Sequence, residues 1–203
     1  MRLSIDKVKV AKEIYLKLPH WNIANECLTD FFCKNKLNTD MNVILSKVAL
    51  IDGLYRTNLQ DPISVAENIA EIEQLDKRLK RGDEDVLAEV SQWNGKKLMS
   101  FSSKFCHFHN KKVYPIYDKY VCLSLNLLID WKNKKEAIDF LEAINKFRVQ
   151  YGLQYIPYED VDKYLWLYGQ REYLEKGKNK INREVRKLYE TDRKLFDRLK
   201  AND

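Results

Sequence analysis

The chain has 203 residues, of which 45% are hydrophobic and 33% are charged. This balance excludes a disordered linker, which lacks the apolar residues needed for a core. A net charge of +6 fits nucleic-acid binding, but a positive field raises affinity for any polyanion and so assigns no partner. The chain has only 6 Gly and 4 Pro, the turn residues of all-β proteins, and their scarcity favours helices.

The cysteines, Cys27, Cys33, Cys106 and Cys122, form no CxxC pair and no cluster of four. This spacing predicts reduced thiols in a cytoplasmic protein, with no zinc or iron–sulfur centre. If the protein is bacterial, we expect it to be associated with the nucleoid. Residues 1–15 are charged and amphipathic, which is not the pattern of a signal peptide. No apolar run approaches the roughly 20 residues that cross a bilayer, so no membrane partner is expected.

Apolar residues recur at helical spacing along nearly the whole chain. Asp40, Asp61 and Asp118 are expected N-caps, and Gly82 is an expected C-terminal stop. The sequence predicts an all-α protein of about ten helices and no strand. The expected helices cover residues 5–18, 22–34, 41–56, 62–80, 83–93, 101–110, 118–130, 134–151, 158–173 and 181–200.

The length suggests a single all-helical domain over residues 1–203. Two packed lobes are possible within it, a middle lobe at 40–130 and a terminal lobe from 1–39 plus 131–203. Neither GxxxxGK[ST] nor GxGxxG occurs, so nothing supports nucleotide hydrolysis. We expect a monomer without a cofactor.

Residues 98–121 carry the main chemical candidates. Lys104 lies among apolar neighbours on a predicted helix, and Tyr114-Pro115-Ile116-Tyr117 leads to Asp118. Pro115 disfavours the helical region for Tyr114, so the chain is extended before Asp118, which stands where an N-cap belongs. Two interpretations follow. Lys104 is either a nucleophile with Asp118 as its carboxylate partner or a half-buried stem, in which case Asp118 is an ordinary cap.

A short string of metal-type residues, Cys106, His107 and His109, lies on the same predicted helix. On a helix Cys106 and His109 share a face but His107 does not, so no metal site is expected. His109 either faces DNA or caps the helix. Lys111 and Lys112 follow it and either contact phosphates or are solvated.

Three segments, in this order, resemble the helix-hairpin-helix DNA glycosylase superfamily, which includes endonuclease III-like and 8-oxoguanine glycosylases. Residues 50–72 resemble its early helix, polar turn and next helix. Within residues 98–121, Lys104 falls where the catalytic lysine follows the hairpin, and Tyr117-Asp118-Lys119-Tyr120-Val121 resembles Val-Asp-Thr-His-Val. Residues 161–173 resemble the late helix with its Trp and Gly. The resemblance spans residues 45–173 and implies the same all-helical fold.

The sequence departs from the family at the hairpin. Leu98-Met99-Ser100-Phe101-Ser102-Ser103 stands where the family has Leu-Pro-Gly-Val-Gly, so serines replace both glycines. A non-standard hairpin is therefore expected, in which Ser100, Ser102 and Ser103 bind DNA or the pocket through their hydroxyls. The spacing from Lys104 to Asp118 is also shorter than in the family by about one helical turn.

The resemblance implies a DNA glycosylase with abasic-site lyase activity, acting on double-stranded DNA that holds a damaged or modified base. The nucleotide leaves the stack, the Lys104 amine attacks C1′ in an apolar setting, and the Asp118 carboxylate stabilises the developing charge. Phe101, Phe105 and Phe108 are the expected apolar neighbours. The base itself is not indicated.

The polar turn before Asp61 holds two further candidates. Arg56 and Asn58 are expected to contact DNA or the pocket, or else to form a capping turn. Two other functions also fit the sequence: a non-catalytic nucleic-acid binder of the same fold, and a helical protein-interaction module.

Overall fold

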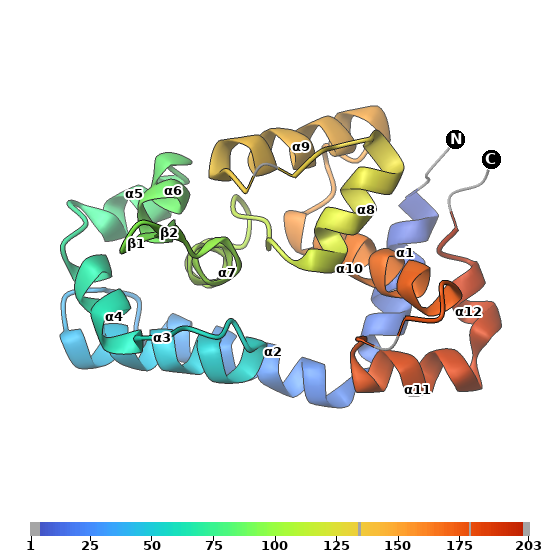
Figure 1. The fold of residues 1–203 in the computed structure, drawn as a ribbon, viewed down its shortest axis with the longest axis horizontal. Helices are drawn as coiled ribbons and strands as arrows, with labels where there is room; N and C mark the ends of the chain where they lie inside the picture. Colours follow the sequence, from blue (N-terminus) through green and yellow to red (C-terminus); the bar gives the residue numbers. More distant parts are fainter. Residues whose placement is uncertain (1–4, 134, 179, 201–203) are drawn as a thin grey trace. The chain divides into compact units, whose positions relative to one another are not determined.

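The computed structural model describes residues 5–133, 135–178 and 180–200. Over these residues the chain forms twelve α-helices and one short two-stranded sheet, which confirms the all-α prediction (Figure 1). Within the described residues, none of the helices is both long and apolar enough to cross a membrane. Two predictions fall partly outside the described residues: the amphipathic N-terminal segment, at residues 1–4, and the helix expected to start at residue 134.

The chain divides into two compact units. Residues 118–130, expected in a middle lobe, belong instead with the chain ends, because helix α8 packs against α10 there. Two helices, α2 (Pro19–Lys34) and α9 (Ala137–Gln150), begin in one unit and end in the other. The first unit is Met1–Ile23, Asp118–Asn133 and Glu142–Asp203; the second is Ala24–Tyr117 and Lys134–Leu141.

In the first unit α10 is central and packs against α1, α8 and α11. Its Val161, Tyr164 and Leu165 are fully buried, as the helical spacing of these residues predicts. The helices of this unit are α1 (Ile5–Leu16), α8 (Lys119–Ile129), α10 (Tyr158–Glu175), α11 (Arg183–Thr191) and α12 (Arg193–Asp197).

Helices α8 and α10 approach closely at Gly169 (Figure 1). A Cβ added to Gly169 would lie 2.2 Å from the carbonyl oxygen of Tyr120, so the position requires glycine. The Ser124 hydroxyl joins the two helices, since it lies 2.9 Å from the Tyr120 carbonyl and 2.6 Å from the Leu165 carbonyl. These contacts hold the N-terminal end of α8, where Asp118 lies.

In the second unit α3 packs against α4 and α7, and α6 packs against α7. Ile44, Val48 and Ile51 of α3 are buried with Phe101 and Phe105 of α7. The complete helices of this unit are α3 (Met41–Tyr55), α4 (Pro62–Ala70), α5 (Leu75–Arg81), α6 (Asp85–Ser91) and α7 (Met99–His109).

The expected caps are confirmed. The Asp40 carboxylate accepts from a backbone N–H at 2.8 Å, that of Asp61 at 3.1 Å and that of Asp118 at 2.7 Å. Gly82 ends α5 with a φ of 79°. Each cap acts within a few residues of its own position, which is why the sequence predicts it correctly.

Two expected helices are interrupted. The helix expected at 62–80 divides into α4 and α5, with Gln74 at a φ of 52°. The adjacent Asp76 carboxylate accepts from the backbone N–H of Asn38 at 3.0 Å, a long-range bond that orients the start of α5. The helix expected at 181–200 divides at Asp192, which has a φ of −141° and caps α12 through the Leu195 N–H.

The hairpin is not where the sequence comparison placed it. Residues 99–103 are helical, and Leu98 precedes them as the N-cap of α7. The strands β1 (Gln92–Trp93) and β2 (Lys96–Lys97) pair antiparallel instead, around Asn94 and Gly95 at φ of 46° and 71°. Asn-Gly is the strongest short hairpin signal, because both positions tolerate positive φ. The prediction of no strand is therefore wrong, and the hairpin joins α6 to α7.

Candidate functional site

Lys104 is buried on α7, with only 2% of its surface exposed. Its Nζ donates to the carbonyl and hydroxyl oxygens of Ser100, at 2.8 and 2.9 Å, and to the Tyr117 carbonyl at 3.2 Å. The amine also lies 5.5 Å from the ring centroid of Tyr55. Ser100 is one helical turn before Lys104, so α7 itself brings these groups together. The lysine amine is therefore held in one position.

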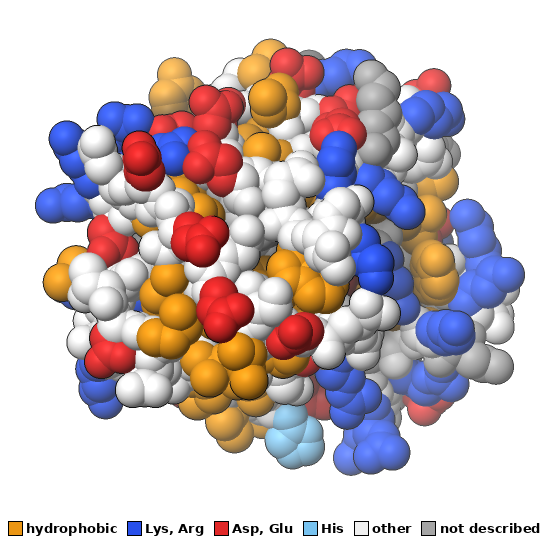
Figure 2. All heavy atoms as spheres, turned by 60° about the vertical axis from the view of Figure 1, so that its left-hand side comes forward, with side chains coloured by type: hydrophobic (Ala, Val, Ile, Leu, Met, Phe, Trp, Pro, Cys, Tyr) orange, Lys and Arg blue, Asp and Glu red, His pale blue; other side chains and the backbone are white. Residues whose placement is uncertain are grey.

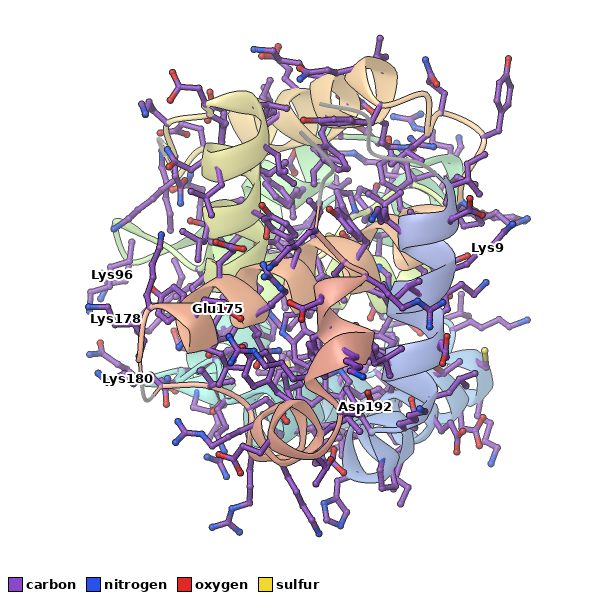
Figure 3. All side chains as sticks on the ribbon, turned by 90° about the vertical axis from the view of Figure 1, so that its right-hand side faces the viewer. Lys9, Lys96, Glu175, Lys178, Lys180 and Asp192 are labelled. Atoms are coloured by element: carbon purple, nitrogen blue, oxygen red, sulfur yellow. The ribbon has the colours of Figure 1, made fainter. Side chains whose placement is uncertain are left out.

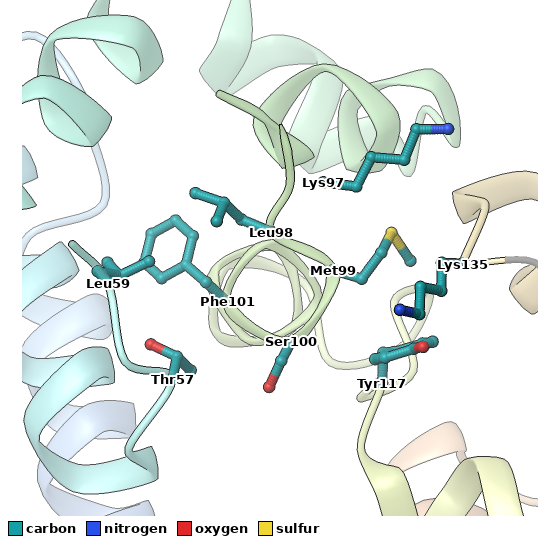
Figure 4. A pocket seen from close by; sticks show the side chains of 9 residues that line it. All are labelled: Thr57, Leu59, Lys97, Leu98, Met99, Ser100, Phe101, Tyr117 and Lys135. Atoms are coloured by element: carbon teal, nitrogen blue, oxygen red, sulfur yellow. The ribbon is translucent and has the colours of Figure 1, made fainter. Parts of the chain in front are cut away.

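A pocket of about 260 Å³ adjoins this amine. In Figure 4, Ser100 projects from α7 between Thr57 and Tyr117. Ser100 and Tyr117 line the pocket and also bind the Lys104 amine, so the amine lies behind these two residues and does not itself line the pocket. The volume is just below the roughly 300–1,000 Å³ of drug-sized sites, so it suits a single ring system better than a large cofactor. The lining residues are Thr57, Leu59, Lys97, Leu98, Met99, Ser100, Phe101, Tyr117 and Lys135.

The polar turn after α3 supplies one side of the pocket. The Asp52 carboxylate accepts from the Thr57 hydroxyl at 2.7 Å and from the Leu59 N–H at 3.1 Å, which fixes the turn. Thr57 and Leu59 line the pocket, whereas the exposed Arg56 and Asn58 do not. Arg56 ends α3 with a φ of 53°, and Asn58 Nδ2 donates to its carbonyl. Arg56 and Asn58 do not line this pocket, and their contact with DNA or an extruded base stays a prediction.

Of the three candidate serines, only Ser100 reaches the pocket. Ser102 and Ser103 are fully buried. The Ser102 hydroxyl donates to the Met99 carbonyl, and the Ser103 hydroxyl accepts from the Tyr117 N–H at 2.9 Å. The prediction that Ser102 and Ser103 bind DNA or the pocket is wrong, because their hydroxyls serve the helix and the chain beside it. Ser103 positions Tyr117 next to α7.

Two of the expected apolar neighbours of Lys104 have a different role. Phe105 and Phe108 pack against Phe32 of α2, with ring centroids 6.0 and 5.6 Å apart. Phe101 lines the pocket. The aromatic ring recorded over the Lys104 amine is that of Tyr55, on α3.

Asp118 lies in the first unit and directly follows Tyr117 in the chain. It has an extended backbone, and its carboxylate accepts from the Tyr120 N–H at 2.7 Å. The cap interpretation of Asp118 is therefore confirmed. A cap does not exclude a second use of the carboxylate, because one oxygen accepts the cap bond and a carboxylate has further lone pairs. Its chemical role stays a prediction.

The structure reveals a second buried lysine, Lys47 of α3. Its Nζ donates to the Asn38 side-chain oxygen at 2.9 Å and to the Leu37 carbonyl at 3.2 Å. Burial lowers the pKa of Lys47 to about 8, although the charge of Asp76 opposes this shift. The spacing contained a signal, because Lys47 is at helical distance from the buried Ile44 and Ile51.

His109 belongs to this second cluster, and Asn110 is the C-cap residue of α7; a contact of His109 with DNA stays a prediction. Its Nε2 lies 3.3 Å from Asn38 Nδ2 and 3.5 Å from the Lys47 amine, and both of these groups are donors. Nε2 therefore accepts, which places the ring proton on Nδ1. Loss of solvent between Phe32 and Phe105, with the nearby Lys47 charge, lowers the pKa of His109 to about 3. The imidazole is neutral at pH 7.

The two lysines after α7 differ. Lys111 donates to the Thr29 hydroxyl at 2.8 Å and lies 5.3 Å from the Phe108 ring centroid. Lys112 is exposed. Phosphate contact by either lysine stays a prediction.

The metal-type residues of α7 serve the fold. His107 Nδ1 lies 2.8 Å from the Tyr114 carbonyl, and burial raises the pKa of the Cys106 thiol. Across residues 5–133, 135–178 and 180–200, no group of three His, Cys, Asp or Glu side chains is placed to hold a metal ion.

Residues 5–113 match the model of the HI_0787_N family, described as an N-terminal domain, and the chain belongs to this family. A protein of Haemophilus influenzae, named "Uncharacterized protein", is 34% identical over 149 residues. That alignment covers 70% of this chain and 73% of the relative. No solved structure matches the chain. The family match includes Lys104 and ends before Asp118.

Proposed function

We propose that this protein is a DNA base-excision glycosylase that also cleaves abasic DNA, with Lys104 as the nucleophile. The observation that carries this proposal is a buried lysine amine bound to Ser100 and Tyr117, two residues that line a pocket. Lysines are almost never fully buried unless their amine is bound to specific partners, so this placement calls for an explanation. The sequence resemblance adds support at one position, because Lys104 on α7 falls where that superfamily has its catalytic lysine.

The chemistry requires the Lys104 amine to give up a proton, so that its lone pair is free next to a flipped-out nucleotide. The Nζ lone pair forms a bond to C1′, and the base leaves with the electron pair of the glycosidic bond and takes up a proton. Opening of the sugar ring then gives a protonated Schiff base. Loss of a C2′ proton breaks the bond to the 3′ phosphate and nicks the strand. The Asp118 carboxylate is the proposed partner that stabilises positive charge at C1′.

The pocket is the proposed site of the extruded base. Tyr117 offers an aromatic ring for a planar base. The Thr57 hydroxyl, which donates to Asp52, can still accept a hydrogen bond, and the Ser100 hydroxyl, which accepts from Lys104, can still donate one. Lys97 also lines the pocket, and its amine is paired with the Glu136 carboxylate. This mixture of rings and hydroxyls suits a nucleobase without selecting which one.

Borohydride trapping tests the proposal. The protein is mixed with duplex oligonucleotides that hold an abasic site or one of a panel of damaged bases, and borohydride reduces any Schiff base to a stable covalent complex. We expect a complex with the unaltered protein and none with Lys104→Gln. Lys47→Gln is the matched control, because Lys47 is the other buried lysine of the same unit and is expected to leave trapping unchanged.

A second pair of variants separates the two uses of Asp118. Asn is as good an N-cap as Asp, so Asp118→Asn keeps α8 capped while it removes the negative charge. We expect slower trapping with folding intact. Trapping at the original rate by Lys104→Gln, or loss of the complex only in Lys47→Gln, contradicts the assignment of the nucleophile. Duplex binding with no complex on any substrate contradicts catalysis and leaves a non-catalytic DNA binder.

A further inference from the structure

Basic residues are concentrated between α10 and α11, in the first unit. Residues 176–187 contain six Lys or Arg and one acidic residue, Glu184. Within residues 176–187, the cations that are exposed and have no ion pair within the described chain are Lys176, Lys178, Lys180, Arg183 and Lys187. We call these five residues, with Lys119, the cationic surface.

Several other exposed cations of the same unit are paired. Lys9 lies 3.2 Å from Asp6, Lys12 lies 2.9 Å from Asp160, and Lys200 lies 3.3 Å from Asp197. Lysine and arginine side chains also gather in groups in the space-filling view (Figure 2). Unpaired like charges close together repel one another, and a bound polyanion relieves that repulsion.

The single acid of the segment is turned away from these cations. The two Glu184 carboxylate oxygens accept from the backbone N–H groups of His20 and Trp21, each at 3.0 Å, at the start of α2. Glu184 therefore caps a different helix of the same unit. It does not neutralise the cationic surface.

The segment is also held in place by its backbone. The Lys180 carbonyl accepts from the Tyr120 hydroxyl and lies 3.4 Å from the Lys119 amine. The Asn182 N–H donates to the buried Gln170 side chain at 2.9 Å, and its own side chain caps α11. Lys119 and Tyr120 form the first turn of α8, whose N-cap is Asp118. The cationic surface therefore adjoins the proposed catalytic carboxylate.

We propose that the cationic surface binds the phosphate backbone of duplex DNA beside Asp118; the choice of DNA rests on the proposed function. Figure 3 shows Lys178 and Lys180 at the outer edge of this unit, away from Asp192. Val185 of α11 and Leu195 and Phe196 of α12 are buried in the core. Among the described residues of 176–200 no large hydrophobic side chain is exposed, which favours a phosphate polymer over a membrane.

The test is the salt dependence of duplex binding, measured by fluorescence anisotropy with an undamaged oligonucleotide. The variant replaces Lys178, Lys180, Arg183 and Lys187 with Gln. Each phosphate contact contributes about 0.9 to the slope of log affinity against log salt, so loss of four lowers the slope by about 3.6. The ratio of the DNA affinity of the unaltered protein to that of the variant should then fall roughly 100-fold between about 50 and 200 mM salt.

The control variant replaces four paired lysines of the same unit, Lys9, Lys17, Lys132 and Lys200, with Gln, which removes the same charge. We expect its slope to match that of the unaltered protein. Equal slopes for all three proteins overturn the inference, as does equal weakening by both variants. Binding to anionic phospholipid vesicles but not to duplex DNA also overturns it.

The inference and the proposed function fail separately. If no protein is trapped by borohydride but the slope falls only in the cationic-surface variant, the DNA surface stands and the lyase proposal falls. If trapping depends on Lys104 while the slope is unchanged, the lyase proposal stands and the surface falls.

Discussion

Replacement of Gly169 by alanine should separate α8 from α10. The new Cβ would lie 2.2 Å from the Tyr120 carbonyl oxygen and 2.9 Å from the Ser124 hydroxyl oxygen, whereas ordinary contact begins at 3.4 Å. The nearest obstacle is backbone and has no rotamer to change. One helix must therefore move by about 1.2 Å relative to the other.

Two opposing effects determine how much unfolding free energy Gly169→Ala loses. Overpacking of this kind costs typically about 1–3 kcal/mol, and a rigid backbone neighbour places Gly169→Ala toward the upper end. Alanine in a helix recovers about 0.5–1 kcal/mol. We expect a net loss of about 2 kcal/mol, which lowers the melting temperature by about 4–8 °C for a chain of this length.

Gly53→Ala is the matched control, because Gly53 is also helical but has no atom within 4 Å of the added Cβ. Only the helix-propensity gain applies there, so we expect a stabilisation of about 0.5–1 kcal/mol. Thermal and urea unfolding of both variants, followed by circular dichroism, measures the difference. Equal stability of the two variants would refute the close approach of α8 and α10 at Gly169.

Two further predictions concern the buried cluster and the cap. His109 has a folded-state pKa of about 3 and an ordinary pKa of 6.5, so the unfolded chain binds more protons between these values. Stability should therefore rise with pH by up to about 1.4 kcal/mol per unit in this range. In a urea-unfolding series His109→Gln should lose this contribution; a pH dependence equal to that of the unaltered protein contradicts the assignment. Asp118→Ala should cost about 1 kcal/mol, whereas Asp118→Asn should cost nearly nothing, and an equal loss in both shows that the cap bond does not matter.

The sequence by itself determined the features that depend on near neighbours. Helical spacing located most helices, and Asp40, Asp61 and Asp118 marked where three of them begin, because a cap bond joins residues two or three apart. The β-hairpin could also have been predicted from near neighbours, because Asn94-Gly95 is a strong turn signal. The family resemblance instead placed the expected hairpin at residues 98–103, which are helical apart from Leu98.

Only the tertiary structure decided which polar groups are enclosed and what they contact. The backbone N–H of Asn38 donates to the Asp76 carboxylate, 38 residues along the chain, just after the break before α5. The Asn38 side chain also contacts the Lys47 amine and His109 Nε2. Ser103 and Tyr117 are bonded across 14 residues, which places Tyr117 at the pocket beside Lys104. Periodicity shows that a side chain lies on a helix face, but a polar group on that face is buried or exposed according to the partners that distant parts of the chain bring to it.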